Sequence, residues 1–171
     1  MLTLLPPLIC MLCCSWYGFS LSGKLENRAK LLSEHSRLIA SLHKSVIAPE
    51  GDTRKTLAEF ATDSKQMKTL LGDILLRLSN SPNESLKSAY LSCAAIYEKQ
   101  KLLTKEEIEC VARALSYEEK LTRMSSAAVI LAEMPRINEF AVFAEEKRRR
   151  DAKLIRSGGM LIGLMLLILL I

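Results

Sequence analysis

The two histidines of this 171-residue chain are the first candidates for a chemical role. A histidine can bind a metal ion or act as a general base. His35 and His43 lie eight residues apart. On a helix this spacing turns their side chains about 80° away from each other. Metal-binding pairs on helices use spacings of three or four residues instead. We therefore expect two histidines on the solvent side of a helix and no metal site.

Two acidic groups are the next candidates. Glu106, Glu107 and Glu109 form one, and Glu118 with Glu119 forms the other. Paired carboxylates can perform general acid–base catalysis. Here Thr104 with Glu107 makes a capping box, and acidic side chains stabilise a helix start. We therefore expect no catalysis, and we treat the five glutamates as a candidate docking surface for a partner protein.

Other marks of an enzyme are missing from the sequence. It contains no glycine-rich phosphate loop, no glycine elbow around a serine and no clustered zinc ligands. The five cysteines are odd in number and irregularly spaced, which fits a reducing compartment. Cys10, Cys13 and Cys14 lie in an apolar run, where they either fill space or carry an acyl group. The sequence predicts a protein that is not an enzyme and has no cofactor.

Charge is distributed very unevenly along the chain. Residues 24–146 hold 18 bases and 18 acids, whereas residues 1–23 and 157–171 hold no charge. The excess lies in a basic belt, residues 147–156, with one acid and six bases. The six bases are Lys147, Arg148, Arg149, Arg150, Lys153 and Arg156. A belt beside an uncharged run is typical of a helix that enters a membrane. It favours anionic lipid headgroups, and not nucleic acid, as its partner.

Both uncharged runs are candidate transmembrane helices. Residues 7–23 would span about 26 Å of a hydrocarbon core about 30 Å thick. A cleaved signal peptide is the alternative, but the run lacks a basic start and a small-residue cleavage site. Residues 157–171 span about 23 Å and need Leu154 and Ile155 to enter as well. We predict transmembrane helices at 1–23 and 154–171. Basic residues follow the first run and precede the second, so the positive-inside rule places the central domain in the cytoplasm.

Small residues recur at a spacing of four in both uncharged runs. Gly159 and Gly163 form a G-x-x-x-G pattern, and Gly18 and Ser22 form a matching pair. Such patterns let two helix backbones approach closely within a membrane. We predict that the two helices pack on each other, or on a neighbouring chain in a homo-oligomer, through these four residues.

The central domain, residues 24–153, has a helical pattern throughout. A stripe at steps of three and four contains Leu25, Ala29, Leu32, Ser36, Ile39, Leu42 and Val46. It continues the first uncharged run, which indicates one long helix. We expect a break at 62–64, a break or kink at Pro135, helix starts at Ser81 and Thr104, and a last helix from about Arg136. The fold class predicted is all-α: an antiparallel bundle of five or six helices between the two transmembrane helices.

Three stretches together resemble one known family. They are Gly18-Phe19 with Leu25 and Arg28, the amphipathic helix 30–46, and the basic belt followed by Gly158, Gly159, Gly163 and a leucine-rich end. This order resembles the stage III sporulation protein AB family of endospore-forming bacteria. The middle departs from the family pattern at 115–123, where Ser116, Glu119 and Arg123 replace its glycine, aspartate and glutamine.

The resemblance implies a non-catalytic platform in the secretion-like channel complex between mother cell and forespore. It implies a location in the outer forespore membrane and a central domain in the mother-cell cytoplasm. That domain would be similar to the cytoplasmic domain of the type II secretion platform protein F. The expected partners are other stage III complex proteins, above all the AA ATPase. The alternative from the residues alone is a membrane-tethered helical scaffold or coiled-coil oligomer unrelated to secretion.

Overall fold

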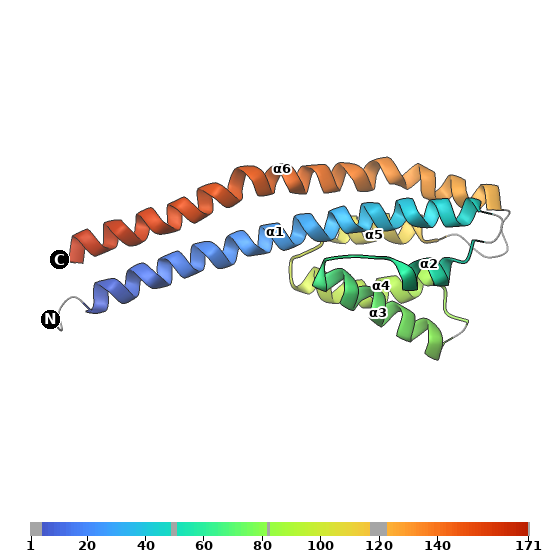
Figure 1. The fold of residues 1–171 in the computed structure, drawn as a ribbon, viewed down its shortest axis with the longest axis horizontal. Coiled ribbons are helices and arrows are strands. Elements are labelled where there is room, and N and C mark those ends of the chain that lie inside the picture. Colours follow the sequence, from blue (N-terminus) through green and yellow to red (C-terminus); the bar gives the residue numbers. More distant parts are fainter. Residues whose placement is uncertain (1–4, 49–50, 82, 117–122, 171) are drawn as a thin grey trace. The chain divides into compact units, whose positions relative to one another are not determined.

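Six α-helices make up the computed structural model, which describes residues 5–48, 51–81, 83–116 and 123–170. No strand occurs among these residues, so the predicted all-α class is confirmed. In chain order the helices are α1 (Leu5–Ile47), α2 (Thr53–Glu59), α3 (Lys65–Asn80), α4 (Leu86–Lys99), α5 (Lys105–Ala114) and α6 (Arg123–Leu170). Figure 1 shows that α1 and α6 are the long helices and that α2–α5 are short.

The chain divides into two compact units. One consists of residues 1–29 and 143–171, and we call it the paired-helix unit. The other consists of residues 30–142, and we call it the bundle unit. Helices α1 and α6 contribute residues to both, whereas α2–α5 lie entirely in the bundle unit.

Local capping explains where the short helices begin. The carboxylate of Asp52 accepts from the backbone N–H groups of Arg54 and Lys55 and starts α2. The hydroxyl of Ser64 accepts from the Met67 N–H and starts α3. Each cap satisfies N–H groups that have no partner within the helix. Residues 60–64 separate α2 from α3, which confirms the predicted break.

Two predicted boundaries are wrong. Helix α4 is capped by Ser85, whose hydroxyl accepts from the Ser88 N–H, and not by Ser81. Glu84 instead binds the Arg77 side chain, with both Nε–Oε distances at 3.0 Å. Helix α6 begins at Arg123 and runs through Pro135 without interruption. Pro135 is exposed, so water can satisfy the carbonyl group that loses its helical donor.

The core of the bundle unit is aliphatic. Leu32, Ile39 and Leu42 from the predicted stripe of α1 are buried, as is Ile74 of α3. Further fully buried side chains come from other helices and from a row on α1 beside the stripe. They include Leu31, Met67, Leu70, Tyr90, Ile130 and Ile137. Removal of this apolar surface from water is the main force that holds such a bundle together.

Hydrogen bonds between helices join the elements of the bundle unit. Ser36 of α1 donates to the Asn138 amide oxygen of α6. The Tyr97 hydroxyl of α4 donates to the Gln66 carbonyl of α3 at 2.8 Å.

Among the described residues, no helix is long and apolar enough to cross a membrane.

Candidate functional site

The paired-helix unit brings together the small residues singled out in the sequence. Added Cβ atoms measure how closely its two backbones approach. On Gly159 such an atom would lie 3.1 Å from the Cys14 carbonyl oxygen and 3.3 Å from the Gly18 Cα. On Gly18 it would lie 3.0 Å from the Ile155 carbonyl oxygen. Small residues let two helix backbones approach closely, and Gly18 and Gly159 form this contact.

One turn away, a polar contact links the same two helices. The Arg156 Nε donates to the Ser22 hydroxyl at 2.8 Å, and its Nη2 lies 3.4 Å from a Glu26 carboxylate oxygen. Ser22 is fully buried, and Gly163 is also buried. Residues later in α1 contact residues earlier in α6, so the two helices run antiparallel. Arg156, assigned to lipid headgroups from the sequence, therefore binds α1 as well.

A groove of about 480 Å³ lies beside the glycine contact. Its walls include Cys13, Tyr17 and Leu21 of α1 and Ile155, Gly158 and Ile162 of α6. None of the residues that line it carries a charge. The thiols of Cys13 and Cys14 are free, and Cys13 is exposed.

Large apolar side chains of the paired-helix unit point outward. Trp16 is 79% exposed and Tyr17 is 69% exposed. The other exposed apolar side chains of this unit are Ile9, Leu12, Phe19, Leu21, Phe143, Leu154, Met160, Leu161, Ile162, Leu164, Met165 and Ile168. A contiguous apolar surface of this kind marks contact with a membrane or a protein partner.

Acidic side chains partly neutralise the basic belt. Glu145 accepts from Arg148 and Arg149, and these hydrogen bonds lower its pKa to about 2. Arg150 pairs with Asp151 at 3.1 Å. The two lysines of the belt, Lys147 and Lys153, are exposed and make no ion pair among the described residues. The belt therefore keeps a net positive charge on its surface.

The predicted acidic docking surface is only partly available. Glu107 is buried, and its carboxylate accepts from the Thr104 N–H at 2.7 Å, which confirms the capping box. Glu106 is exposed but pairs with Arg136 of α6 at 2.6 Å. Glu109 is exposed and lies 3.9 Å from the Lys105 ammonium. Glu118 and Glu119 lie outside the described residues.

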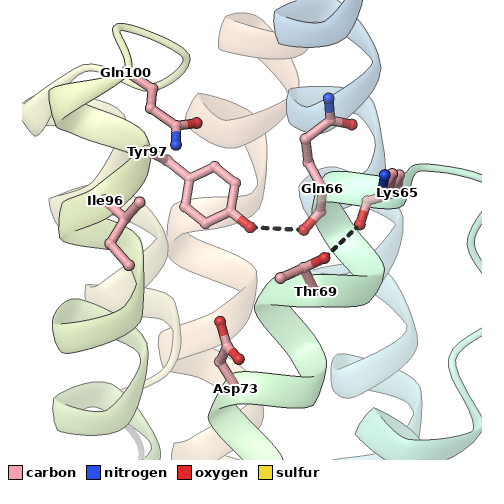
Figure 2. A pocket seen from close by; sticks show the side chains of 7 residues that line it. All are labelled: Lys65, Gln66, Thr69, Asp73, Ile96, Tyr97 and Gln100. Carbon is pink, nitrogen blue, oxygen red and sulfur yellow. Dashed lines mark hydrogen bonds between the residues drawn. The ribbon is translucent and has the colours of Figure 1, made fainter.

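A polar cleft of about 310 Å³ lies between α3 and α4 (Figure 2). It is lined by Lys65, Gln66, Thr69, Asp73, Ile96, Tyr97 and Gln100. Figure 2 shows the Tyr97 hydroxyl directed at the Gln66 carbonyl. Burial raises the pKa of Tyr97, and the charge of Asp73 raises it further. The cleft thus offers hydrogen-bonding groups, and its hydroxyls are already used within the bundle.

The prediction of two solvent-side histidines is wrong for His35. This side chain is fully buried; its Nδ1 lies 2.8 Å from the Leu31 carbonyl, and its Nε2 lies 3.1 Å from the Tyr90 hydroxyl. Because the carbonyl can only accept, Nδ1 donates and Nε2 accepts. Burial is the largest cause of the lowered His35 pKa. His43 is half-buried.

A signal for the burial of His35 was present in the sequence. Leu31 lies four residues before it and Leu38 three residues after it, and both are buried. These positions form a second apolar row on α1, beside the predicted stripe. His35 interrupts that row with a polar group, which the Tyr90 hydroxyl then satisfies.

A partly buried polar cluster joins α5 to α6. Glu133 accepts from Arg113 and from the Cys110 thiol, at 3.1 Å and 3.2 Å. Burial, with the Glu133 hydrogen bond second, raises the pKa of Cys110 to about 11. The thiol serves as a structural donor in this cluster. In the part of the chain that the structure covers, no three His, Cys, Asp or Glu side chains gather where they could hold a metal ion.

Comparison with known proteins yields one match. The family model described as stage III sporulation protein AB matches residues 4–171, which is nearly the whole chain. No curated protein and no solved structure matches it.

Proposed function

Because the chain belongs to the stage III sporulation protein AB family and hence to stage III of sporulation, we propose that it is a membrane platform. In this proposal it is a non-catalytic component of the secretion-like channel complex between mother cell and forespore. It lies in the outer forespore membrane, with the bundle unit in the mother-cell cytoplasm. The observation that carries the proposal is the family match over residues 4–171.

Two features of the paired-helix unit support membrane attachment. Its large apolar side chains point outward, and residues 1–23 and 157–171, which belong to it, carry no charge. In water such a surface would be unfavourable by about 25 cal/mol for each Å² exposed. In a bilayer the same side chains face hydrocarbon, and the belt at 147–156 faces the cytoplasmic headgroups.

The bundle unit is the proposed docking site for a cytoplasmic ATPase, the AA protein of the same complex. We also propose that this unit has the fold of the cytoplasmic domain of the type II secretion platform protein F. Of the predicted acids, Glu106 and Glu109 at the start of α5 have side chains 63% and 51% exposed, and they support a docking surface there. Glu107 has no part in it, because its carboxylate caps α5.

The docking proposal is tested with the full chain in a mild detergent and the purified ATPase. Glu109→Lys is expected to weaken the complex about fivefold at low ionic strength, and less in high salt, because charge at an interface rim is screened. Glu98→Lys, an exposed reversal on α4, is the matched control. Unchanged binding in Glu109→Lys would move the docking surface elsewhere. Absence of any ATPase binding, together with assembly into rods, would favour the scaffold alternative.

A further inference from the structure

We propose that the groove of the paired-helix unit holds one acyl chain of an anionic phospholipid, with its headgroup beside Lys24. The inference rests on the proposed membrane attachment and adds a defined lipid site to it. The groove has an uncharged lining that runs along both helices, and Lys24 lies one helical turn beyond its α1 wall. The lining corresponds to the acyl chain of such a lipid, and the lysine to its headgroup.

The shape of the groove fits a chain. Its α1 wall extends from Cys13 to Leu21, and its α6 wall from Ile155 to Ile162. These spans correspond to about 12 Å and about 10 Å along the helix axes. The walls offer thiol, aromatic and aliphatic surface without a charged group, which suits a hydrocarbon segment and not a charged headgroup.

Gly158 distinguishes this groove from the neighbouring helix contact. A Cβ atom on Gly18 or Gly159 would meet backbone atoms of the facing helix, so their contact explains both glycines. A Cβ atom on Gly158 would meet no described atom within 4 Å, although this residue lines the groove. A glycine within a helix costs about 1 kcal/mol relative to alanine. A ligand that lies flat against the backbone at Gly158 would offset this cost.

The charge at one end of the groove selects an anionic lipid. Lys24 lies one turn beyond Leu21 on α1, is exposed, and makes no hydrogen bond or ion pair among the described residues. Two carboxylates lie at the same level, and each already has a basic partner: Arg156 binds Glu26, and Arg150 binds Asp151. The Lys24 ammonium is therefore available for a phosphate.

The belt also argues against a second copy of the chain as the occupant. A copy with the same orientation in the membrane would bring its own six bases and one acid against those of the first. Like charges placed together at an interface oppose association. A phospholipid with a negative headgroup has the complementary charge.

Flotation of the full chain with vesicles comes first, because failure to float would refute membrane attachment itself. The floated protein is then extracted in mild detergent and examined by native mass spectrometry after exposure to phosphatidylglycerol or phosphatidylcholine. We expect one retained phosphatidylglycerol per chain and a preference of about fivefold over phosphatidylcholine, the amount that one lysine near a charged headgroup supplies.

Two pairs of variants test the two parts of the lipid. Gly158→Leu fills the groove and is expected to float but lose the retained lipid, whereas Ser157→Leu, one residue along and outside the groove, keeps it. Gly158→Ala adds a single methyl group and should reduce lipid retention in part. This variant still tests the site if Gly158→Leu does not insert into vesicles. Lys24→Gln should abolish the preference between the two lipids. Lys153→Gln, which removes a belt charge about 200° around α6 from Ile155, should preserve that preference.

The outcomes separate the possible occupants. Equal lipid retention by Gly158→Leu and the unchanged chain would overturn the acyl-chain site. Equal retention of both phospholipids by the unchanged chain would overturn the headgroup site. A lipid-free dimer that the Gly158→Leu substitution dissociates would assign the groove to a second copy of the chain. Protein that floats with vesicles but retains no lipid and forms no dimer would also overturn the proposal.

Discussion

The bundle unit and the paired-helix unit bury opposite kinds of residue. In the bundle unit Met67, Leu70 and Ile130 are fully buried, and the core is made of large side chains. In the paired-helix unit the buried residues are small, such as Gly18 and Ser22, while Trp16 is 79% exposed. The first pattern is that of a protein held together by the hydrophobic effect in water. The second is that of helices which associate by close packing in an apolar surrounding.

The difference teaches how one pair of helices can make two kinds of contact. Helices α1 and α6 supply residues to both units, and the choice of side chain changes along each helix. Near Leu32 and Leu42 large residues point into the bundle core. Near Gly18 and Gly159 the backbones themselves make the contact. The following predictions test this contrast, beginning with the largest expected effect.

The bundle core should be the most sensitive region of the chain. Ile74→Ala removes a buried side chain and should lower the free energy of unfolding by about 2–5 kcal/mol. Leu76→Ala on the same helix removes an exposed side chain and should change it by no more than about 0.5 kcal/mol. Chemical unfolding of the full chain in detergent, followed by circular dichroism, measures both. Similar losses in the two variants would contradict the assigned core.

The glycine contact should be the most sensitive point of the paired-helix unit. Gly159→Leu places a side chain where a backbone carbonyl lies 3.1 Å away, and should cost about 1–3 kcal/mol of helix pairing. Spin labels placed near the start of α1 and near the end of α6 should then show a longer and broader distribution of the distance between the two labels. Gly23→Leu is the control, because no described atom lies within 4 Å of an added Cβ there. An unchanged distance in Gly159→Leu would refute the contact.

The buried His35–Tyr90 pair should make the bundle sensitive to acid. Tyr90→Phe leaves His35 Nε2 without its donor and should cost about 1–3 kcal/mol. Because burial lowers the pKa of His35 in the folded chain, the unfolded chain binds a proton first as the pH falls. Stability should therefore be complete above the ordinary histidine pKa of about 6.5 and decrease below it, until the folded pKa is reached.

Unfolding measurements between pH 7 and pH 5 check this dependence. His35→Gln should be less stable at pH 7 but should lose less stability than the unchanged chain over the same interval. His43→Gln, a change at a half-buried histidine, is the control and should keep the slope of the unchanged chain. Equal slopes in His35→Gln and the unchanged chain would assign the acid sensitivity to other groups.

The smallest expected effect lies at the end of α4. Lys101 has a φ of 57°, a left-handed conformation in which glycine is favoured, and its N–H donates to the Glu98 carbonyl. Lys101→Gly should stabilise the bundle by up to about 1 kcal/mol, because a side chain at this φ is unfavourable. Lys99→Gly, within the helix, should destabilise by about 1 kcal/mol. Thermal unfolding compares the two, and loss of stability in Lys101→Gly would contradict the role given to φ.

Much of the fold could be predicted from local patterns. The continuous helix from the first uncharged run, the break at 62–64 and the Thr104 cap each depend on residues within four positions of one another. The start of α4 was predicted four residues too early, because Ser81 and Ser85 both suit a cap and only packing selects one. The break that Pro135 suggested as one alternative does not occur, because the long helix around it and an exposed site accommodate the proline.

The candidate site was predictable in its residue types and less so in its geometry. The spacing of four identified Gly18, Ser22, Gly159 and Gly163, and the structure places the first and third in direct backbone contact. The charge pattern identified the belt but not the bond from Arg156 to Ser22. The sequence likewise does not assign Glu107 to one role, since one carboxylate can cap a helix or face a partner. In the structure it caps α5.

The sequence by itself determined the helices, their amphipathic faces, the basic belt and the small-residue pairs, because these arise from local spacing and side-chain chemistry. The tertiary structure alone decided that Tyr90 is the hydrogen-bond partner of His35 and that Gly158 opens onto a groove. These two features depend on which distant segments come together. That is set by the free energy of packing the whole chain and not by any short stretch of residues.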